Sequence, residues 1–265
     1  MITYNGHILL TPSGKWYTVN RHLPPFTIRL LYKDGVIPTF SKGTGVQVSQ
    51  NPNVWDLTYN NTNWDYILYN HSDLLAIMGA NTTGVTSLYS ACQNCSSLTT
   101  VALFDTSSVQ YMHVLFAGCI NLNSIAQLDT SNVTTMYMMF DSCKSLVTIP
   151  QFNTSNVTDM GYMFNDCDDL EIVPLLDTSK VSGMNAMFSD CISLKNIPLF
   201  NTSSVIYMDS TFNNCTKVES GALTLYNQVS SQSVPPVNHY YTFRNCGLDT
   251  VTGAAELAQI PSDWK

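Results

Sequence analysis

The sequence predicts a repeat solenoid, in which one short unit is copied along the chain and each copy stacks on the next. Three residue types recur every 24 residues. They are Val85, Val109, Val133, Val157, Val181, Val205 and Val229, then Cys95, Cys119, Cys143, Cys167, Cys191 and Cys215, and Met112, Met136, Met160, Met184 and Met208. A fixed period of this length indicates a unit that cannot bury its apolar side alone and must stack on its own copies.

Each unit is expected to contain mainly short β-strands and one helical turn. Leu146, Ile149 and Phe152 have apolar counterparts one period earlier and one period later, so we expect them to point inward. A proline follows the second of these positions at 150, 174 and 198, and it should end the strand because it lacks a backbone donor. The spacing of Phe164 and Cys167 predicts a single helical or 3₁₀ turn.

A polar corner follows the strand in five successive units. The corner begins with an Asp or Asn and continues with Thr-Ser, at Asp105, Asp129, Asn153, Asp177 and Asn201. These side chains can accept a hydrogen bond from the backbone two residues on, which turns the chain without leaving amides unpaired. Because Asn replaces Asp at two of the five places, the column predicts a structural ladder and no metal site.

The period sets the expected boundaries. We predict an N-terminal cap at 47–70, seven coils at 71–245 and a C-terminal cap at 246–265, which together form one domain from 47 to 265. In the first coil His71 takes the place of the cysteine and Cys92 that of the phenylalanine. About seven extra residues between 230 and 238 predict a protruding loop, and the tail ending at Trp264 should cover the last coil.

Residues 1–46 lie outside the period and predict a small β element that caps the solenoid or attaches it to something else. Asn5-Gly6 and Asp34-Gly35 are two-residue turn signals between apolar runs, so we expect two hairpins, separated by Pro24-Pro25.

Composition excludes several classes of function. The net charge is −8 with only 11% charged residues, which disfavours nucleic acid as a partner. No apolar run is long enough to insert into a membrane, and the start at Met1 lacks the features of a signal peptide. We therefore expect folding in the cytosol, and the sequence contains no motif that calls for a cofactor.

The eight cysteines are expected to be free and buried. Seven of them, from Cys95 to Cys246, occupy one position of successive coils, and Cys92 fills a core position. Stacked positions lie about 4.8 Å apart, which is longer than the separation of about 3.8 Å between Cβ atoms that a disulfide prefers. A ladder of thiols acting as small apolar residues is the better interpretation.

The repeat resembles a known family. The pattern Ser-Asn-Val-Thr-x-Met-x-x-Met-Phe-x-x-Cys-x-x-Leu at 131–146, which returns at 155–170, is similar to the BspA-like leucine-rich repeat. The resemblance covers about residues 71–246 and implies a right-handed solenoid of the leucine-rich-repeat type with an adhesion or interaction role and no enzymatic activity. Bacterial members are surface lipoproteins, and similar repeats are encoded by bacteriophages of gut bacteria.

Exposed aromatic residues are the candidate ligand-binding site. They lie between the repeated valine and phenylalanine or after the insertion, and they are Tyr111, His113, Tyr137, Tyr162, Tyr207, Tyr240 and Tyr241. Tyrosine offers rigid contact area and a polar tip, which suits protein and sugar partners alike. We expect a virion protein that contacts a host surface protein or glycan, or other virion proteins. The alternative is a bacterial cell-surface adhesin whose export signal is missing from this sequence.

A glycan-cleaving enzyme is the third hypothesis, because glycoside hydrolysis needs only two carboxylates at a defined separation. Acidic residues gather in two adjacent coils, at Asp141, Asp159, Asp166, Asp168, Asp169 and Glu171. No Lys or Arg is expected beside them to stabilise a transition state, so the cluster favours a solvated acidic patch and no catalytic residue is predicted.

Overall fold

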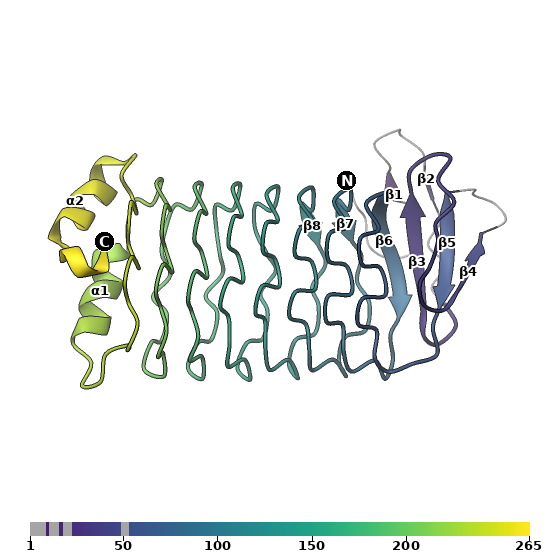
Figure 1. The fold of residues 1–265 in the computed structure, drawn as a ribbon, viewed down its shortest axis with the longest axis horizontal. Coiled ribbons are helices and arrows are strands. Elements are labelled where there is room, and N and C mark those ends of the chain that lie inside the picture. The colour runs from purple at the N-terminus through teal and green to yellow at the C-terminus, as the bar shows by residue number, and fades with distance from the viewer. Residues whose placement is uncertain (1–8, 11–15, 18–22, 49–52) are drawn as a thin grey trace.

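The computed structural model describes residues 9–10, 16–17, 23–48 and 53–265 of the 265-residue chain. It is an elongated stack of coils with a β-sheet at the N-terminal end and two α-helices at the C-terminal end (Figure 1). The fold is rich in extended structure, repeats along its length and contains an open sheet, which confirms the prediction of a strand-rich repeat fold.

The sheet at the N-terminal end has six strands in the order β4-β5-β3-β6-β7-β8. Its strands are β3 (Thr27–Tyr32), β4 (Thr44–Gln47), β5 (Val54–Thr58), β6 (Leu74–Asn81), β7 (Thr100–Val101) and β8 (Ser124–Ile125). The pairs among β3, β4, β5 and β6 are antiparallel, whereas β6, β7 and β8 run parallel. The antiparallel part therefore joins directly onto the stacked coils. A separate antiparallel pair is formed by β1 (Leu9–Leu10) and β2 (Trp16–Tyr17).

The N-terminal part is more tightly joined to the coils than the sequence suggests. The expected boundary after residue 46 falls inside β4, and the sheet continues across it. The predicted hairpin around Asp34-Gly35 is wrong. A turn does form there, with the Val36 N–H donating to the Lys33 carbonyl at 3.2 Å, but β5 and β6 already occupy both edges of β3. The other predicted hairpin, around Asn5-Gly6, lies outside the described residues.

Prolines shorten the strand in the three coils that contain Pro150, Pro174 and Pro198, as predicted. The Ala126 N–H donates to the Val101 carbonyl of the preceding coil at 2.9 Å. Pro150 stands 24 residues after Ala126 and has no N–H to donate. Strands β7 and β8 consequently give way to isolated bridges in later coils, such as that between Thr148 and Ile172.

The predicted helical turn before each cysteine is wrong. We call residues 136–146 and their counterparts in the other coils the turn segments. In the turn segment 136–146 the N–H groups alternate between two kinds of acceptor. The Met138 N–H donates to the Gly161 carbonyl of the next coil at 3.0 Å, whereas the Met139 N–H donates to the Met136 carbonyl of its own coil at 3.1 Å. Met138 and Ser142 have φ angles of 54° and 59°, in the left-handed region, which interrupts any right-handed helix.

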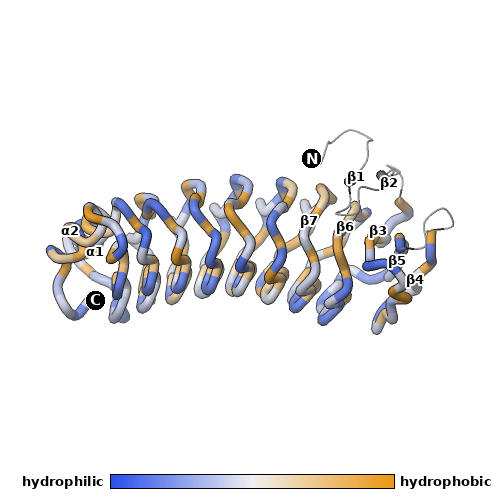
Figure 2. The backbone as a smooth tube through the Cα atoms, turned by 90° about the horizontal axis from the view of Figure 1, so that it is seen from above, coloured by the Kyte–Doolittle hydropathy of each residue, from blue (hydrophilic) through white to orange (hydrophobic). Residues whose placement is uncertain are grey.

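The core is a set of parallel side-chain ladders. Leu146, Phe152 and Met160 are at most 2% exposed, as the period predicts. Phenylalanines of successive coils stack with ring centroids 5.3 to 5.9 Å apart, from Phe116 to Phe243. Figure 2 shows hydrophobic and hydrophilic segments alternating within every coil. Each coil therefore buries its apolar side chains against both neighbours.

The cysteines are free and buried, as predicted, and all eight lie in the described residues. The six repeat thiols from Cys95 to Cys215 each donate to a main-chain carbonyl, and the Cys119 Sγ lies 3.1 Å from the Cys92 oxygen. Burial raises the pKa of the Cys95 thiol to about 12, and burial raises the pKa of Cys143 well above its ordinary value. The ladder is therefore composed of neutral thiols that pack as small apolar groups.

Two α-helices and a short 3₁₀-helix close the C-terminal end. They are α1 (Ala222–Ser230), α2 (Val251–Gln259) and η1 (Ser262–Trp264). The inserted loop after α1 exposes Val234 and Val237, whereas Trp264 stacks on His239 with ring centroids 4.2 Å apart. A Cβ atom at Gly253 would lie 2.1 Å from the Val218 carbonyl oxygen, so α2 packs closely against the last coils. Within the described part of the chain, neither helix has the length and hydrophobicity needed to cross a bilayer.

Candidate functional site: aromatic residues on the turn columns

The candidate residues lie on three columns formed by the turn segments and by the residue that precedes each of them. The first column consists of residues joined by parallel bridges, Asn63, Ser87, Tyr111, Thr135, Asp159, Gly183, Tyr207 and Asn238. The second column lies two residues later and contains Asp65, Tyr89, His113, Tyr137, Gly161, Asn185, Asp209 and Tyr240. The third has positive φ throughout and contains Tyr66, Ser90, Val114, Met138, Tyr162, Ala186, Ser210 and Tyr241.

Backbone pairing between coils fixes these columns, and the third-column N–H groups from Tyr66 to Ser210 all donate to carbonyls of the next coil. The Met160 N–H donates to the Gly183 carbonyl at 2.9 Å, and the Tyr162 N–H donates to the Asn185 carbonyl at 2.9 Å. Other N–H groups close turns within their own coil, as the Met163 N–H does with the Met160 carbonyl at 3.1 Å. In the second column the Gly161 N–H donates to the Asp159 carboxylate at 2.9 Å. A ligand on this surface must therefore be recognised chiefly by side chains.

The structure divides the seven predicted residues into two groups. Tyr111 and His113 meet edge to face with ring centroids 6.2 Å apart, and Tyr137 and Tyr162 do so at 5.9 Å. The other three, Tyr207, Tyr240 and Tyr241, are 47 to 57% exposed and belong to the C-terminal end of the stack.

One coil that has no aromatic ring on the three columns separates the two groups. Its residues on the three columns are Gly183, Asn185 and Ala186. The expectation of one shared aromatic face is therefore replaced by a larger N-terminal group and a smaller C-terminal one.

Three further members of the N-terminal group, Tyr66, Tyr69 and Tyr89, were not among the residues predicted from the sequence. The rings of Tyr66 and Tyr89 lie 5.0 Å apart between centroids, and Tyr89 stacks on His113 at 4.2 Å. Tyr66 also meets Tyr69 at 5.7 Å. The period contains the signal that finds Tyr89, since it precedes His113 by one repeat. Tyr66 lies in the cap, where the repeat pattern fades.

The N-terminal aromatic group comprises Tyr66, Tyr69, Tyr89, Tyr111, His113, Tyr137 and Tyr162, and its rings are neutral. Burial lowers the pKa of His113, although the nearby Asp65 carboxylate acts in the opposite direction. Burial also raises the pKa of the Tyr137 phenol. The Asp65 carboxylate accepts the Tyr89 N–H at 3.1 Å and a hydrogen bond from the Ser87 hydroxyl. The group is therefore suited to a ligand that carries little charge and offers flat or hydroxylated surfaces.

The acidic cluster contains cations, contrary to the expectation that no Lys or Arg accompanies it. Lys144 Nζ lies 3.0 Å from Asp166 Oδ1 and 3.3 Å from Asp168 Oδ2. Lys195 Nζ lies 2.5 Å from Glu171 Oε2. These pairs were not predictable from the sequence because each partner belongs to a neighbouring coil. The pairs stand on the surface, where such ion pairs contribute little to stability.

One family model matches the chain. Its description is Mycoplasma protein of unknown function, DUF285, and it matches residues 83–172 and 169–235, which together make up more than half of the sequence. This match supports the resemblance to BspA-like repeats at the level of the family. Neither a curated protein nor a solved structure matches the chain.

Proposed function

This chain belongs to the family of Mycoplasma proteins of unknown function, DUF285, and from that premise we propose that it is a non-enzymatic interaction protein. In this proposal the stack is a right-handed solenoid of the leucine-rich-repeat type. The core residues serve the stacking alone, and the turn columns present the recognition surface.

The observation that carries the proposal is the N-terminal aromatic group. Seven neutral rings project from a backbone that is hydrogen-bonded to the coils on both sides. The Met138 N–H donates to the next coil, and the Met139 carbonyl accepts from Phe116 of the preceding one. Rings held in this way lose little conformational freedom on binding, so contacts with a partner are not offset by a large ordering cost. The surface therefore has the properties of a preformed binding site for a glycan or a protein.

For the location, we propose a virion component that contacts the host surface or other virion proteins. The chain combines a hydrated surface of low charge density with a long core in which the cysteines are free and buried. A protein of this kind folds in the host cytosol and is then assembled into a particle.

A bacterial cell-surface adhesin is the second candidate. The description of the matching family refers to Mycoplasma proteins, which favours a cellular carrier. The recognition surface would be the same in both cases, and only the attachment would differ.

The recognition surface is tested with substitutions drawn from the same columns. Tyr66→Ser, Tyr89→Asn and Tyr111→Thr introduce residues that occupy equivalent places in Ser90, Asn185 and Thr135. The triple variant should fold normally and lose most binding to host cells, measured by flow cytometry with the purified, labelled protein. The control is Tyr241→Ser in the C-terminal group, because Ser210 occupies the equivalent place in the same column. Unchanged binding of the triple variant would refute the assignment of this surface.

The location is tested by electron microscopy of purified particles with gold-labelled antibody against a tag on this chain. Gold on particles supports the virion assignment, and gold on the envelope of the producing cell supports the adhesin. The non-enzymatic assignment is tested by incubation with host polysaccharide. Cleavage that Asp168→Asn or Asp169→Asn abolishes would overturn it.

A further inference from the structure

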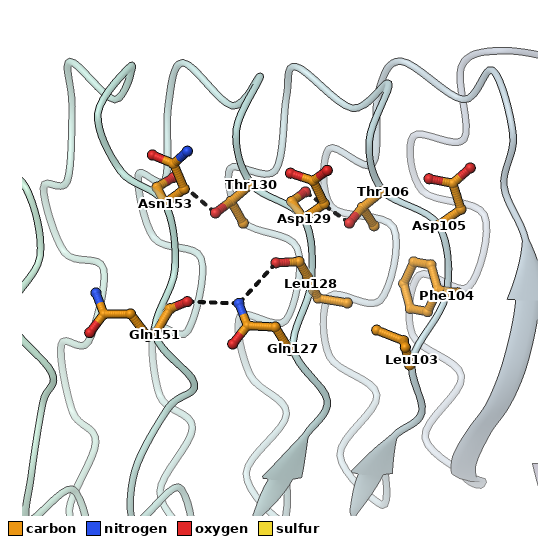
Figure 3. Close-up of a pocket in the computed structure, with 10 residues that line it drawn as sticks. All are labelled: Leu103, Phe104, Asp105, Thr106, Gln127, Leu128, Asp129, Thr130, Gln151 and Asn153. Atoms are coloured by element: carbon orange, nitrogen blue, oxygen red, sulfur yellow. Dashed lines mark hydrogen bonds between the residues drawn. The ribbon is translucent and has the colours of Figure 1, made fainter. Parts of the chain in front are cut away.

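A groove crosses three coils beside the corner residues (Figure 3). Its volume is about 560 Å³, and it is lined by the segments 103–106 and 127–130 together with Gln151 and Asn153. Leu103, which is 39% exposed, and Phe104 give it an apolar end. None of the residues on the turn columns takes part, so this surface is distinct from the aromatic groups.

Side chains join the coils along this groove. The Thr106 hydroxyl donates to the Asp129 carbonyl at 2.8 Å, and the Thr130 hydroxyl donates to the Asn153 carbonyl at 2.9 Å. The Gln127 amide reaches the Gln151 carbonyl at 2.7 Å (Figure 3). These bonds occupy carbonyl oxygens of the next coil and leave the N–H groups of the same segments without a backbone acceptor.

Eight main-chain N–H groups are therefore unpaired. None of the N–H groups of residues 103–106 and 127–130 has a hydrogen-bond partner within the described part of the chain. Buried backbone amides are almost always paired, so those unpaired groups that face the groove are available to water or to a ligand. The groove thus offers runs of unpaired donors, whereas most N–H groups of the turn segment 136–146 are paired.

Two carboxylates stand on the rim without a cation. Asp105 and Asp129 each accept the N–H of the serine two residues on, at 2.9 Å. Hydrogen bonds from Ser107 and Ser131 lower the pKa of these two carboxyls, so both are ionised at neutral pH. Among the described residues no Lys or Arg forms an ion pair with either of them. Asp177, further along the same column, differs because the nearby Lys180 contributes to its lowered pKa.

We propose that this groove binds an extended polypeptide segment of a partner protein that carries lysine or arginine side chains. The carbonyl oxygens of an extended chain would accept the unpaired N–H groups of 103–106 and 127–130. Its cationic side chains would pair with Asp105 and Asp129, and an apolar side chain would contact Leu103. This inference does not depend on the function proposed for the turn columns.

Other ligand classes satisfy only part of the groove. An anion would accept from the main-chain N–H groups, but the two carboxylates would repel it. A small cation would pair with the carboxylates and leave the N–H groups unused. A neutral glycan can use both kinds of group, but its binding does not require the negative charge. A variant that removes only the charge therefore distinguishes a cationic peptide from a glycan.

Asp105→Asn with Asp129→Asn is that variant. Asn occupies the same column at Asn153 and Asn201, where it accepts the same hydrogen bond from the serine two residues on. The double variant should therefore keep the fold and lose only the charge. The control is Asp169→Asn with Glu219→Gln, which removes the same charge from exposed residues outside the groove.

The probe is a fluorescein-labelled decapeptide of alternating lysine and threonine, with a glutamate and threonine decapeptide for comparison. Fluorescence anisotropy at low salt should show binding of the lysine peptide alone. The groove variant should raise its Kd about 3- to 10-fold, and the control variant should change it less than about 2-fold. Equal losses in the two variants would mean general charge attraction and would overturn the proposal. Absence of binding, or equal binding of the glutamate peptide, would also overturn the proposal.

Amide hydrogen exchange tests the main-chain part. Addition of the lysine peptide should slow exchange of the N–H groups at 103–106 and 127–130, because paired amides exchange more slowly than open ones. The turn segment at 136–146 is the internal reference and should keep its exchange rates. Peptide binding without added protection at 103–106 would show that the segment does not lie in the groove.

Discussion

The turn segment and the polar corner of each coil are joined to the next coil in different ways. We call the corner at residues 153–155, together with its counterparts in the other coils, the corner segment. In the turn segment, backbone donates to backbone, as from Phe140 to Met163 at 2.9 Å. In the corner segment, side chains take over, as when Thr154 donates to the Asp177 carbonyl at 2.9 Å. The first arrangement leaves recognition to projecting rings, and the second leaves main-chain donors free. One repeat therefore provides two surfaces with different chemistry.

The largest expected effect comes from a substitution in the core that both segments share. Met160→Asp places a carboxylate at a position that is fully buried. An unpaired buried charge costs several kcal/mol, and each coil depends on its neighbours, so several coils should unfold. Circular dichroism during thermal unfolding should show a lowered Tm or loss of the folded signal.

Tyr162→Ala is the matched control on the turn columns. Ala186 already occupies the equivalent place with positive φ, so the Tm should stay nearly unchanged. A folded Met160→Asp protein with an unchanged Tm would contradict the continuous core.

The side-chain bridges of the corner are tested by Thr154→Val. Thr154 is 1% exposed, and its hydroxyl supplies a bond between coils that no backbone donor replaces. Its loss should lower the free energy of unfolding by about 1 to 2 kcal/mol, measured by urea denaturation.

Thr158→Val is the counterpart next to the turn segment. The Thr158 hydroxyl also donates between coils, to the Thr134 carbonyl at 3.2 Å, but the Thr158 N–H donates to the same oxygen at 3.0 Å. The exposed hydroxyl is therefore dispensable, and the effect should stay within about 0.5 kcal/mol. Equal losses in the two variants would remove the distinction between the segments.

The strain in the turn segment is tested by Ser142→Gly. Ser142 has φ 59°, and Gly118 occupies the equivalent place one coil earlier with φ 74°. A side chain in the left-handed region costs about 1 to 2 kcal/mol, whereas glycine costs about 0.5 to 1 kcal/mol in chain entropy. The variant should therefore gain up to about 1 kcal/mol in urea denaturation. Ser145→Gly, at a residue without positive φ, should lose stability, and a loss at both sites would argue against stored strain.

The smallest effect concerns pH. Burial raises the pKa of Asp141 above its ordinary value of 3.8. Its protonated form is thus favoured in the folded state, and this contribution to stability is lost as pH rises through the folded pKa. Asp141→Asn should flatten the dependence of Tm on pH in the window that begins near 3.8 and extends above the folded pKa. Asn165 occupies the same column, so the fold should tolerate the change. A parallel pH profile in both proteins would show that Asp141 does not contribute.

The positions that repeat were predictable because each does the same task in every coil. Phe152 faces the core, Thr154 follows the corner residue, and Cys143 packs as a free thiol. The turn segment was not predictable, since Met138 and Ser142 have no local preference for positive φ. Helix α1 was missed because Val229 keeps the 24-residue spacing although the chain around it is helical. Lys144 was missed as the partner of Asp166 because the pair spans two coils.

By itself, the sequence determined the register of the stack, since a 24-residue period allows only one alignment of Val157, Met160 and Cys167 with their copies. The tertiary structure alone decided which backbone groups are paired. Whether an N–H finds an acceptor depends on the path of the neighbouring coil, which no single repeat contains. For the same reason, the meeting of Tyr89 with His113 and the open amides around Leu103 became visible only when the coils were placed side by side.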